Sequence, residues 1–407
     1  MTLFSRVSQD CPAGLAAQRP RAATGRGQPT LGIIGGGQLA RMTAMATLKL
    51  GHDVVVLERS ADAPAATLAT HALVGDWNDP AVLAELATRA DVVTLENEFV
   101  DAAALATLER MGATVLPGSA MMGRVQDKYL QKVLLRDAGI PVAPFLPART
   151  PDELHAAAAR LGFPFVLKAR RDGYDGRGNR TVRAAEDLHD AYASLGGGTR
   201  PLYAEAWCDF SVELATIVVR GRAGGTAVYP VVETVQADHV CRIVRAPAAV
   251  DAEAARTVER LATAAAVALG AVGCLGVECF LMRDGSVLVN ELAPRVHNSG
   301  HYTIEACACS QFENHARAVL GLPLGATHLV APAAVMVNLL GQSAGPARSA
   351  GLDLALAVPG ASVHIYGKDR SAPGRKLGHV TALGATVAAA EAVASRCASE
   401  IRFGAAS

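Results

Sequence analysis

The sequence predicts an α/β protein with two or three domains. From Leu31 onward, short apolar runs alternate with helical segments, which indicates a parallel sheet. Beyond Leu202, apolar runs follow one another across glycine-rich turns, as antiparallel strands do. The chain has 407 residues, of which 51% are hydrophobic, so it can bury an ample core.

The composition excludes several classes of protein. The formal net charge is zero and only 4% of residues are aromatic, so neither nucleic acid nor an acidic membrane surface is an expected partner. No apolar run reaches the roughly 18 residues of a membrane span. Eight cysteines are scattered without paired metal-binding spacings, which predicts small buried side chains in a reducing cytoplasm.

Residues 1–29 differ in composition from the rest of the chain. They contain several arginines and one acidic residue, Asp10, with proline and glycine throughout and no apolar signal segment. We expect a disordered extension here. An organelle transit peptide is the alternative.

The next part of the chain is predicted to form the parallel sheet. A buried strand at Leu31–Ile34 precedes a glycine turn and a helix over Gln38–Leu50. Further strands are expected at Asp53–Leu57, Ala72–Val74, Asp91–Leu95 and Thr114–Leu116.

The glycine turn matches a weak nucleotide-binding pattern. Gly35-x-Gly37-x-x-Ala40 fits the dinucleotide fingerprint, and Glu58 follows the next strand near the ribose position. Physically, the turn predicts only an anion at a helix N-terminus, so a mononucleotide would satisfy it equally. Glu96 and Glu98 follow the strand that ends at Leu95 and are expected at the same ligand-binding edge. Two solvated carboxylates are the alternative.

Two helices and a strand then lead to a second glycine-rich segment. Helices are expected over Gln126–Ala138 and, after a Thr150 cap, to Leu161, and a strand over Phe163–Lys168. The segment Arg170–Asn179 carries three glycines between cations, which predicts a loop that covers phosphates. It lacks the P-loop pattern, and a flexible surface turn is the alternative.

Antiparallel strands follow. They are expected at Leu202–Glu205, Ser211–Arg220 and Thr226–Glu233, with Glu213 projecting from the second, before a helix over Asp251–Leu269.

A hairpin provides the strongest site prediction. Strands at Leu275–Met282 and Ser286–Leu292 flank Asp284-Gly285, a strong two-residue turn signal. If those two residues form the turn, Glu278 faces Glu291 at about 5 Å.

The opposed carboxylates predict a metal. On the same face, Phe280 would pair with Val289 and Met282 with Val287, so the repulsion between the two acids would be costly without a cation. All-oxygen ligands favour Mg²⁺ or Mn²⁺. With the phosphate loop, they imply Mg-ATP. An exposed acidic hairpin face is the alternative.

The stretch Asn290–His301 continues from this hairpin. It carries Arg295, His297, Asn298 and a second histidine between Pro294 and Gly300, as expected for a functional loop fixed on a strand. A solvated polar loop is the alternative.

The last segment is predicted to supply cations. After a helix over Ser310–Leu320, strands are expected at Ala333–Leu340 and Ser362–Tyr366. Lys368 and Arg375 follow and are suited to an anionic substrate, although a solvated basic turn is equally compatible with the spacing.

These motifs resemble the ATP-grasp superfamily and, more narrowly, the 5-(carboxyamino)imidazole ribonucleotide synthase family of purine biosynthesis. The similarity covers roughly Leu31 to the His379 region, and NELAPRVHNSGH and GYDGRG make it specific. Further matching motifs are GGGQLARM, GVECF, SQFENH, LGLPLG and PGRKLGH.

The resemblance implies an α+β ATP-grasp fold with a Rossmann-like pre-ATP-grasp domain (30–125), an ATP-grasp domain (126–327) and a small β-rich C-terminal domain (328–407). It implies a ligase that uses ATP and bicarbonate to carboxylate 5-aminoimidazole ribonucleotide, giving ADP and phosphate, and a homodimer.

The resemblance also assigns residues. Expected ATP-binding residues are Arg124, Lys168, Gly173, Tyr174, Asp175, Gly176, Arg177, Gly178, Asn179, Glu205, Ala206, Trp207, Cys208, Glu213, Gln236, Asn290 and Glu291. The ribonucleotide is assigned to Gly37, Gln38, Leu39, Glu96, Lys368 and Arg375, and magnesium to Glu278 and Glu291. Expected catalytic residues are Tyr174, Asp175, Arg177, Arg295, His297 and Asn298.

Two departures from the family pattern are visible. Gln236 stands where many relatives have histidine, which puts one nucleotide contact in doubt. Glu96-Asn97-Glu98-Phe99 replaces the more common Glu-Phe-Glu-Asn but keeps both acids.

The expected mechanism runs through carboxyphosphate. Bicarbonate attacks the γ-phosphate, Arg295 binds bicarbonate oxygens, and His297 or Asp175 accepts the proton of the attacking amine. Three rivals are a nicotinamide-dependent oxidoreductase, another ATP-grasp ligase or formate-using transformylase, and a non-catalytic nucleotide-binding regulator.

Overall fold

The computed structural model describes residues 27–173 and 178–404. Its N-terminal unit is a parallel sheet in the order β3-β2-β1-β4-β5, which confirms the predicted strands. The strands are β1 (Leu31–Ile34), β2 (Val54–Glu58), β3 (His71–Val74), β4 (Val92–Leu95) and β5 (Thr114–Val115). The helices are α1 (Gln38–Lys49), η1 (Ala66–Leu68), α2 (Pro80–Arg89), α3 (Ala102–Arg110) and α4 (Ser119–Val125). Because β1 pairs with both β2 and β4, the strand order reverses there, at the crevice where ligands of such sheets bind.

A small antiparallel sheet follows, in the order β6-β9-β7-β8. Its elements are α5 (Lys128–Asp137), β6 (Phe145–Pro147), α6 (Pro151–Leu161), β7 (Phe165–Ala169), β8 (Asn179–Val182), η2 (Ala185–Asp187), α7 (Leu188–Ser194) and β9 (Leu202–Ala206). The predicted helix Gln126–Ala138 begins two residues late. Asp127 is its N-cap and accepts hydrogen bonds from the amides of Tyr129 and Leu130, so the helix starts at Lys128.

The largest sheet has nine strands in the order β15-β14-β10-β12-β13-β16-β21-β19, with β11 beside β10. Its first part contains β10 (Phe210–Arg220), β11 (Thr226–Val228), β12 (Val232–Ala237), β13 (Val240–Ala246), α8 (Ala252–Leu269), β14 (Gly273–Met282), β15 (Val287–Ala293), η3 (Asn298–Gly300), α9 (Thr303–Ala306) and α10 (Gln311–Leu320). The predicted single strand Thr226–Glu233 is wrong. It is divided into β11 and β12 around Pro230, which has no amide for a sheet ladder.

The C-terminal segment extends this sheet. Its elements are β16 (Ala333–Leu340), β17 (Gly345–Pro346), β18 (Ser349–Ala350), α11 (Leu352–Leu356), β19 (Ala361–Ile365), β20 (Arg370–Ser371), β21 (Lys376–Gly384), α12 (Val387–Glu400) and β22 (Arg402–Phe403). β16 pairs with β13, so backbone hydrogen bonds cross the expected boundary between residues 327 and 328.

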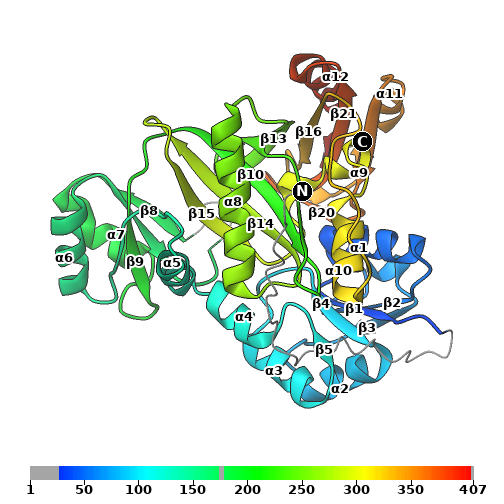
Figure 1. Cartoon of the computed structure of the whole chain (residues 1–407), viewed down its shortest axis with the longest axis horizontal. Coiled ribbons are helices and arrows are strands. Elements are labelled where there is room, and N and C mark those ends of the chain that lie inside the picture. The colour runs from blue at the N-terminus through cyan, green and yellow to red at the C-terminus, as the bar shows by residue number, and fades with distance from the viewer. Residues whose placement is uncertain (1–26, 174–177, 405–407) are drawn as a thin grey trace, which may run out of the picture.

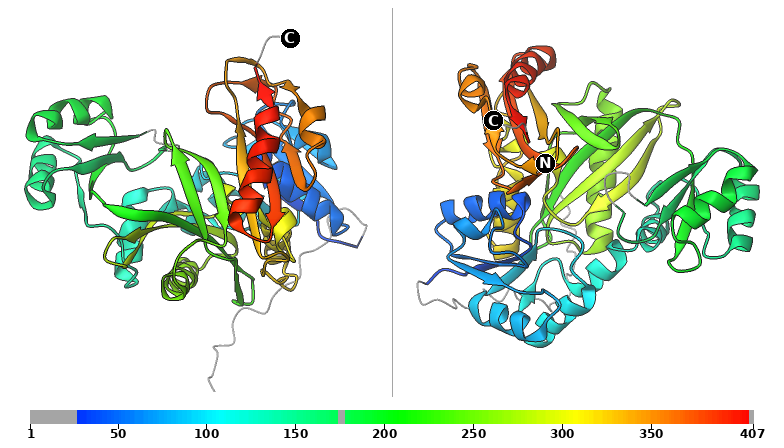
Figure 2. Two further views of the ribbon diagram at one scale, coloured as in Figure 1. Left: turned by 90° about the horizontal axis from the view of Figure 1, so that it is seen from above. Right: turned by 180° about the vertical axis from the view of Figure 1, so that it is seen from behind.

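Figure 1 shows the small unit with α6 and α7 at one end of the molecule, while α1, α10 and α12 lie at the other end. The views from above and behind in Figure 2 keep this separation. The β14–β15 hairpin lies between the two ends.

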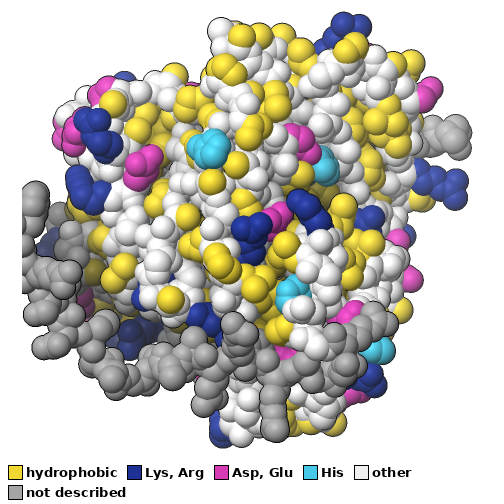
Figure 3. All heavy atoms as spheres, turned by 45° about the vertical axis from the view of Figure 1, so that its right-hand side comes forward, with side chains coloured by type: hydrophobic (Ala, Val, Ile, Leu, Met, Phe, Trp, Pro, Cys, Tyr) yellow, Lys and Arg dark blue, Asp and Glu magenta, His cyan; other side chains and the backbone are white. Residues whose placement is uncertain are grey.

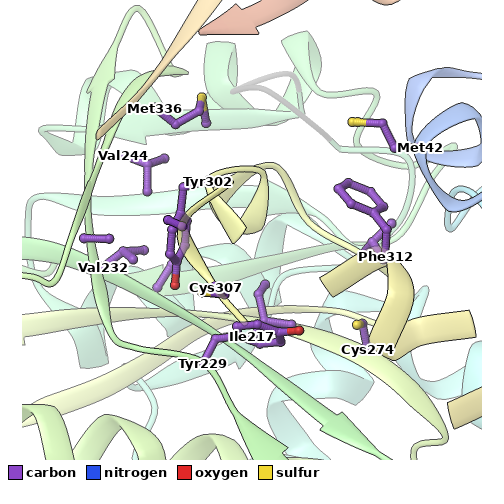
Figure 4. Packing of buried hydrophobic residues seen from close by; sticks show 14 of the residues in the cluster. Met42, Ile217, Tyr229, Val232, Val244, Cys274, Tyr302, Cys307, Phe312 and Met336 are labelled. Atoms are coloured by element: carbon purple, nitrogen blue, oxygen red, sulfur yellow. The ribbon is translucent and has the colours of Figure 1, made fainter. Parts of the chain in front are cut away.

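One buried cluster joins three parts of the chain. Met42 on α1, Phe312 on α10 and Met336 on β16 pack into it with Tyr229 and Tyr302 (Figure 4). All five side chains are at most 6% exposed. The cluster therefore fixes the N-terminal unit, the large sheet and the C-terminal strands against one another.

The surface carries no block of one charge sign on the face seen in Figure 3, where acidic, basic and histidine side chains lie near one another. Within residues 27–173 and 178–404, no helix has the length and hydrophobicity needed to cross a membrane. The cysteines in this part of the chain form no disulfide, and all except Cys208 are buried.

Candidate functional site

A cleft of about 1600 Å³ brings most of the predicted site together. Its walls are the small sheet, the β14–β15 hairpin and the edge of the N-terminal sheet. The predicted residues that line it are Gln38, Leu39, Glu96, Lys168, Gly173, Asn179, Trp207, Glu213, Gln236, Glu278, Asn290, Glu291, Arg295, His297, Asn298, Lys368 and Arg375. Gly37, Gly178, Glu205, Ala206 and Cys208 lie next to lining residues in the sequence or in space, without lining the cleft themselves. Tyr174, Asp175, Gly176 and Arg177 lie outside the described residues.

The hairpin places Glu278 directly opposite Glu291, as predicted, although the predicted turn is wrong. The amide of Met282 donates to the Ser286 carbonyl (2.8 Å), which leaves three residues in the turn, and its last residue, Gly285, has φ +85°.

The longer turn shifts the neighbouring pairs. Phe280 faces Leu288 and Leu281 faces Val287, in place of the predicted pairs of Phe280 with Val289 and Met282 with Val287. A register shift between Glu278 and Cys279 then restores the expected pairing of the two acids.

The two carboxylates are electrostatically coupled. Burial and the charge of Glu291 raise the pKa of Glu278 to about 8, so the free site holds a proton there at neutral pH. The Lys128 ammonium lies 2.9 Å from Glu291. His297 Nε2 lies 3.5 Å from Glu278. Burial and the Arg295 charge lower the pKa of His297 to about 3, so its imidazole is neutral.

This donor set fits a divalent cation whose coordination is completed by a ligand. Among the described residues, no three His, Cys, Asp or Glu side chains form a metal-binding group. Two opposed carboxylates with an open cleft suit Mg²⁺, which takes one or two carboxylates together with phosphate oxygens and water.

Lys128 is a site residue that the sequence prediction missed. It lines the cleft, whereas the predicted Arg124 is exposed on α4 and does not. The available signal was the capping residue Asp127, which places Lys128 at the first position of α5. Asp127 also accepts three hydrogen bonds from the Arg170 guanidinium (2.9, 3.0 and 2.6 Å), and Arg170 is the first residue of the glycine-rich segment.

A buried ion triad supports Lys168. Glu205 pairs with Lys168 and, at 2.5 Å, with Lys132, and Lys132 also donates to the Val289 carbonyl (3.3 Å). Although burial opposes ionisation, the two ammonium groups lower the pKa of Glu205 to about 2. Lys132 was also missed, because its spacing does not distinguish it from a surface lysine.

Arg295 and Glu98 form a two-bond ion pair. Arg295 Nε and Nη2 donate to Glu98 at 2.5 and 3.0 Å, and Nη1 donates to the Val296 carbonyl at 3.1 Å. Burial favours the neutral acid, but Arg295 overcomes it and lowers the pKa of Glu98 to about 2. One N–H of each Nη group is left for a ligand.

The glycine turn is filled by acids of the chain itself. The Gly36 amide donates to Glu58 (2.8 Å), and a Cβ at Gly37 would lie 2.3 Å from Glu96 Oε1. Burial raises the pKa of Glu96. A dinucleotide pyrophosphate would have to displace Glu58, so the geometry disfavours the oxidoreductase reading.

Four more of the predicted residues, Glu213, Gln236, Lys368 and Arg375, also line the cleft. Gln236, which stands where many relatives have histidine, donates to the Glu213 carboxylate (3.0 Å). The glutamine therefore contacts the acid that is expected to bind the ribose. Lys368 lies 5.9 Å from the Tyr366 ring centre, and Arg375 donates to the Arg370 carbonyl.

Models of three domains match the chain. The ribonucleotide synthetase preATP-grasp domain matches residues 29–126, the ATP-grasp domain 133–312, and the phosphoribosylaminoimidazole carboxylase C-terminal domain 334–393.

Curated relatives match most of the chain. The N5-carboxyaminoimidazole ribonucleotide synthase of Mycobacterium tuberculosis is 43% identical over 379 residues, which are 92% of this chain and 88% of that protein. The chloroplastic phosphoribosylaminoimidazole carboxylase of Vigna aconitifolia is 41% identical over 89% of this chain, and the match spans 65% of that protein.

Solved structures share the fold. N5-carboxyaminoimidazole ribonucleotide synthetase from Thermotoga maritima is 38% identical, with a TM-score of 0.83 over 92% of this chain and 99% of that one. The Aspergillus clavatus N5-carboxyaminoimidazole synthase in complex with ADP and 5-aminoimidazole ribonucleotide is 37% identical, with a TM-score of 0.83 over 91% of this chain and 97% of that one. The likeness covers all three units and confirms the predicted fold class.

Proposed function

The chain belongs to the N5-carboxyaminoimidazole ribonucleotide synthase family, and from this premise we propose that it is an ATP-dependent ligase acting in purine biosynthesis. It carboxylates 5-aminoimidazole ribonucleotide with bicarbonate and releases ADP and phosphate. The observation that carries the proposal is that one cleft is lined by Lys168, the hairpin acids and Arg295 together with Gln38 and Glu96.

Nucleotide binding is assigned to the small-sheet side of the cleft. Glu205 fixes Lys168 where its ammonium can bind phosphate oxygens. Trp207 and Glu213 line the cleft beyond it and suit the adenine and ribose.

The hairpin is the proposed metal site. Glu278 and Glu291 would hold Mg²⁺, or Mn²⁺ in its place, with phosphate oxygens as the other ligands. When bound, the ion would supply positive charge against the β- and γ-phosphate oxygens. Lys128, paired with Glu291, adds a fixed positive charge to the same place.

The part of the cleft that contains Arg295 and His297 is assigned to the carboxylation step. Bicarbonate attacks the γ-phosphate to give carboxyphosphate, and the free N–H groups of Arg295 hold its oxygens. The ribonucleotide amine then attacks the carboxyl carbon, or CO₂ released from carboxyphosphate, and phosphate leaves. His297, whose imidazole is neutral in the free site, accepts the amine proton. Asp175 is the alternative acceptor.

The function is tested by ADP release. With ATP, magnesium and 5-aminoimidazole ribonucleotide present, adding bicarbonate to bicarbonate-depleted enzyme is expected to raise ADP release at least tenfold, because carboxyphosphate formation consumes bicarbonate. Equal ADP release with and without bicarbonate would contradict the carboxylation and favour another ATP-grasp ligase.

Ribonucleotide binding is tested at Gly37. Gly37→Ala is expected to raise the KM for 5-aminoimidazole ribonucleotide about tenfold, because the new methyl group would displace the Glu96 carboxylate. The KM for ATP should change less than about twofold. Gly51→Ala, at a position open to solvent but with φ +81°, is the control for general destabilisation. If the KM for the ribonucleotide did not change, the assignment of Glu96 to the ribonucleotide-binding site would be wrong.

Three finer assignments belong to this proposal. The protein acts in the cytoplasm, which suits the absence of disulfides within residues 27–173 and 178–404, and it acts as a homodimer. Its domains are residues 30–125, 126–327 and 328–407, with the large sheet shared by the last two.

A further inference from the structure

Residues Asn290–His301, called the functional stretch below, are held by buried carboxamide side chains that do not themselves line the cleft. The chain leaves the sheet after Ala293, where β15 ends, and Arg295, His297 and Asn298 line the cleft. β15 is the edge strand of the large sheet, so β14 satisfies backbone groups on one side only, and the outward groups need other partners.

Gln131 supplies these partners at the start of the stretch. Its Oε1 accepts from the Leu292 amide (2.9 Å) and its Nε2 donates to the Leu292 carbonyl (3.1 Å). Gln131 lies on α5 and is 2% exposed. One side chain thus takes the place of a neighbouring strand at one residue.

Gln311 holds His297, five residues after Leu292, in the same way. It lies on α10 and is fully buried. Its Oε1 accepts from the His297 amide (2.9 Å), and its Nε2 donates to the His297 carbonyl (2.7 Å) and contacts His301 Nδ1 (3.3 Å). Gly300 is the residue that leaves room for it, because a Cβ there would lie 2.6 Å from Gln311 Oε1.

A third carboxamide holds a side chain. Asn338 on β16 exchanges two hydrogen bonds with the side-chain carboxamide of Asn298 (3.0 and 2.7 Å) and donates to the Cys241 carbonyl (3.0 Å). It is 6% exposed. The three carboxamides therefore come from three separate elements.

We propose that Gln131, Gln311 and Asn338 are positioning residues of the reaction, which hold Arg295, His297 and Asn298 in register with the bound nucleotide. The proposal rests on the proposed carboxylation. A carboxamide suits this task because it satisfies one N–H and one C=O of the same residue without adding charge beside Arg295 and Glu278. Small displacements of reacting groups are costly to rate, so loss of a clamp should reduce kcat more than substrate binding.

The chain contains a matched control on the same helix. Asn314 is fully buried and clamps Gly325 in the same way, accepting from its amide (2.7 Å) and donating to its carbonyl (3.1 Å). Gly325 does not line the cleft. A variant at Asn314 therefore loses the same kind of interaction without touching the functional stretch.

The experiment compares Gln311→Leu with Asn314→Leu in the full chain. We measure kcat, the KM of each substrate, the ADP released per carboxylated product, and the thermal midpoint. Gln311→Leu is expected to lower kcat about 10- to 100-fold and to release more ADP per product. Asn314→Leu is expected to lower the thermal midpoint similarly and to keep kcat within about twofold. Equal kcat and equal ADP per product in the two variants would overturn the proposal.

Gln311→Glu provides a second test, in which the size of the side chain is kept. The ionised carboxylate cannot donate to the His297 carbonyl, whereas the protonated carboxyl can. The kcat of this variant relative to the unmodified enzyme should therefore rise as pH falls. A pH-independent ratio would overturn the positioning role. If the unmodified enzyme shows no bicarbonate-dependent turnover, the proposed function fails, whereas kinetic equality of the variants in an active enzyme refutes only the clamp.

Discussion

Glu291→Gln is expected to lower ATP turnover about a thousandfold, the equivalent of roughly 4 kcal/mol in the activation free energy. The change removes one of the two opposed carboxylates of the hairpin while keeping the size of the side chain. Because Glu278 holds a proton in the free site, Glu291 carries most of the negative charge that can attract a cation. The measurement is ADP release at saturating ATP, bicarbonate and 5-aminoimidazole ribonucleotide over a range of magnesium concentrations.

The Lys128→Met variant distinguishes the loss of a metal ligand from the loss of the Lys128–Glu291 ion pair. Glu291→Gln also deprives Lys128 of its partner, so part of its effect could arise from that ammonium. If so, Lys128→Met would reproduce the loss. We expect instead that it raises the KM for ATP about tenfold and keeps magnesium-dependent turnover. Unchanged magnesium-dependent ADP release in Glu291→Gln would show that the hairpin is not the metal site.

The hairpin shows what sequence reasoning can establish. Alternation along the strands places Glu278 and Glu291 on one face, and a turn of two residues pairs them. The actual turn has three residues, and a register shift beside Glu278 cancels the error. Alternation was a sound basis for the prediction because core burial enforces it. Turn length and bulges depend on local backbone geometry that Asp284-Gly285 did not determine.

Long-range pairs could not be predicted in this way. Glu98 and Arg295 are 197 residues apart in sequence. Arg295 was predicted as a catalytic residue and Glu98 was expected at the ligand-binding edge, but the two were not paired. Lys128 was missed because the start of α5 depends on which residue caps it, and Asp127 was placed inside the predicted helix. Arg124 was assigned from the family resemblance. The clamp residue Gln311 lies in an amphipathic helix pattern where burial of a polar side chain has no sequence signal.

Arg295→Leu is expected to lower kcat at least a hundredfold and to destabilise the protein by about 2 to 4 kcal/mol. The activity falls because the N–H groups assigned to bicarbonate are lost. The stability falls because the Glu98 carboxylate loses both hydrogen bonds from the guanidinium. The cost is below that of a fully buried pair, since the Glu98 side chain keeps 27% exposure. Steady-state kinetics and denaturant unfolding measure the two effects.

The pH dependence of the stability loss follows from Glu98. In the unmodified protein the pKa of folded Glu98, about 2, lies below the ordinary glutamate value of 4.5. Its contribution to stability is therefore complete above pH 4.5 and disappears as pH falls towards 2. Without Arg295, burial raises the pKa above 4.5, so ionisation opposes folding at neutral pH. The difference in unfolding free energy between the two proteins should therefore narrow between about pH 7 and about pH 5.

The double variant Glu98→Gln/Arg295→Leu distinguishes the two roles of the arginine. It removes the unpaired charge, so the unfolding free energy should return to within about 1 kcal/mol of the unmodified protein and become nearly independent of pH in this range. Its kcat should stay low, because no cation remains to hold bicarbonate. If the double variant recovered activity as well as stability, Arg295 would serve only to neutralise Glu98, and bicarbonate binding would have to be assigned to another cation of the cleft such as Lys376.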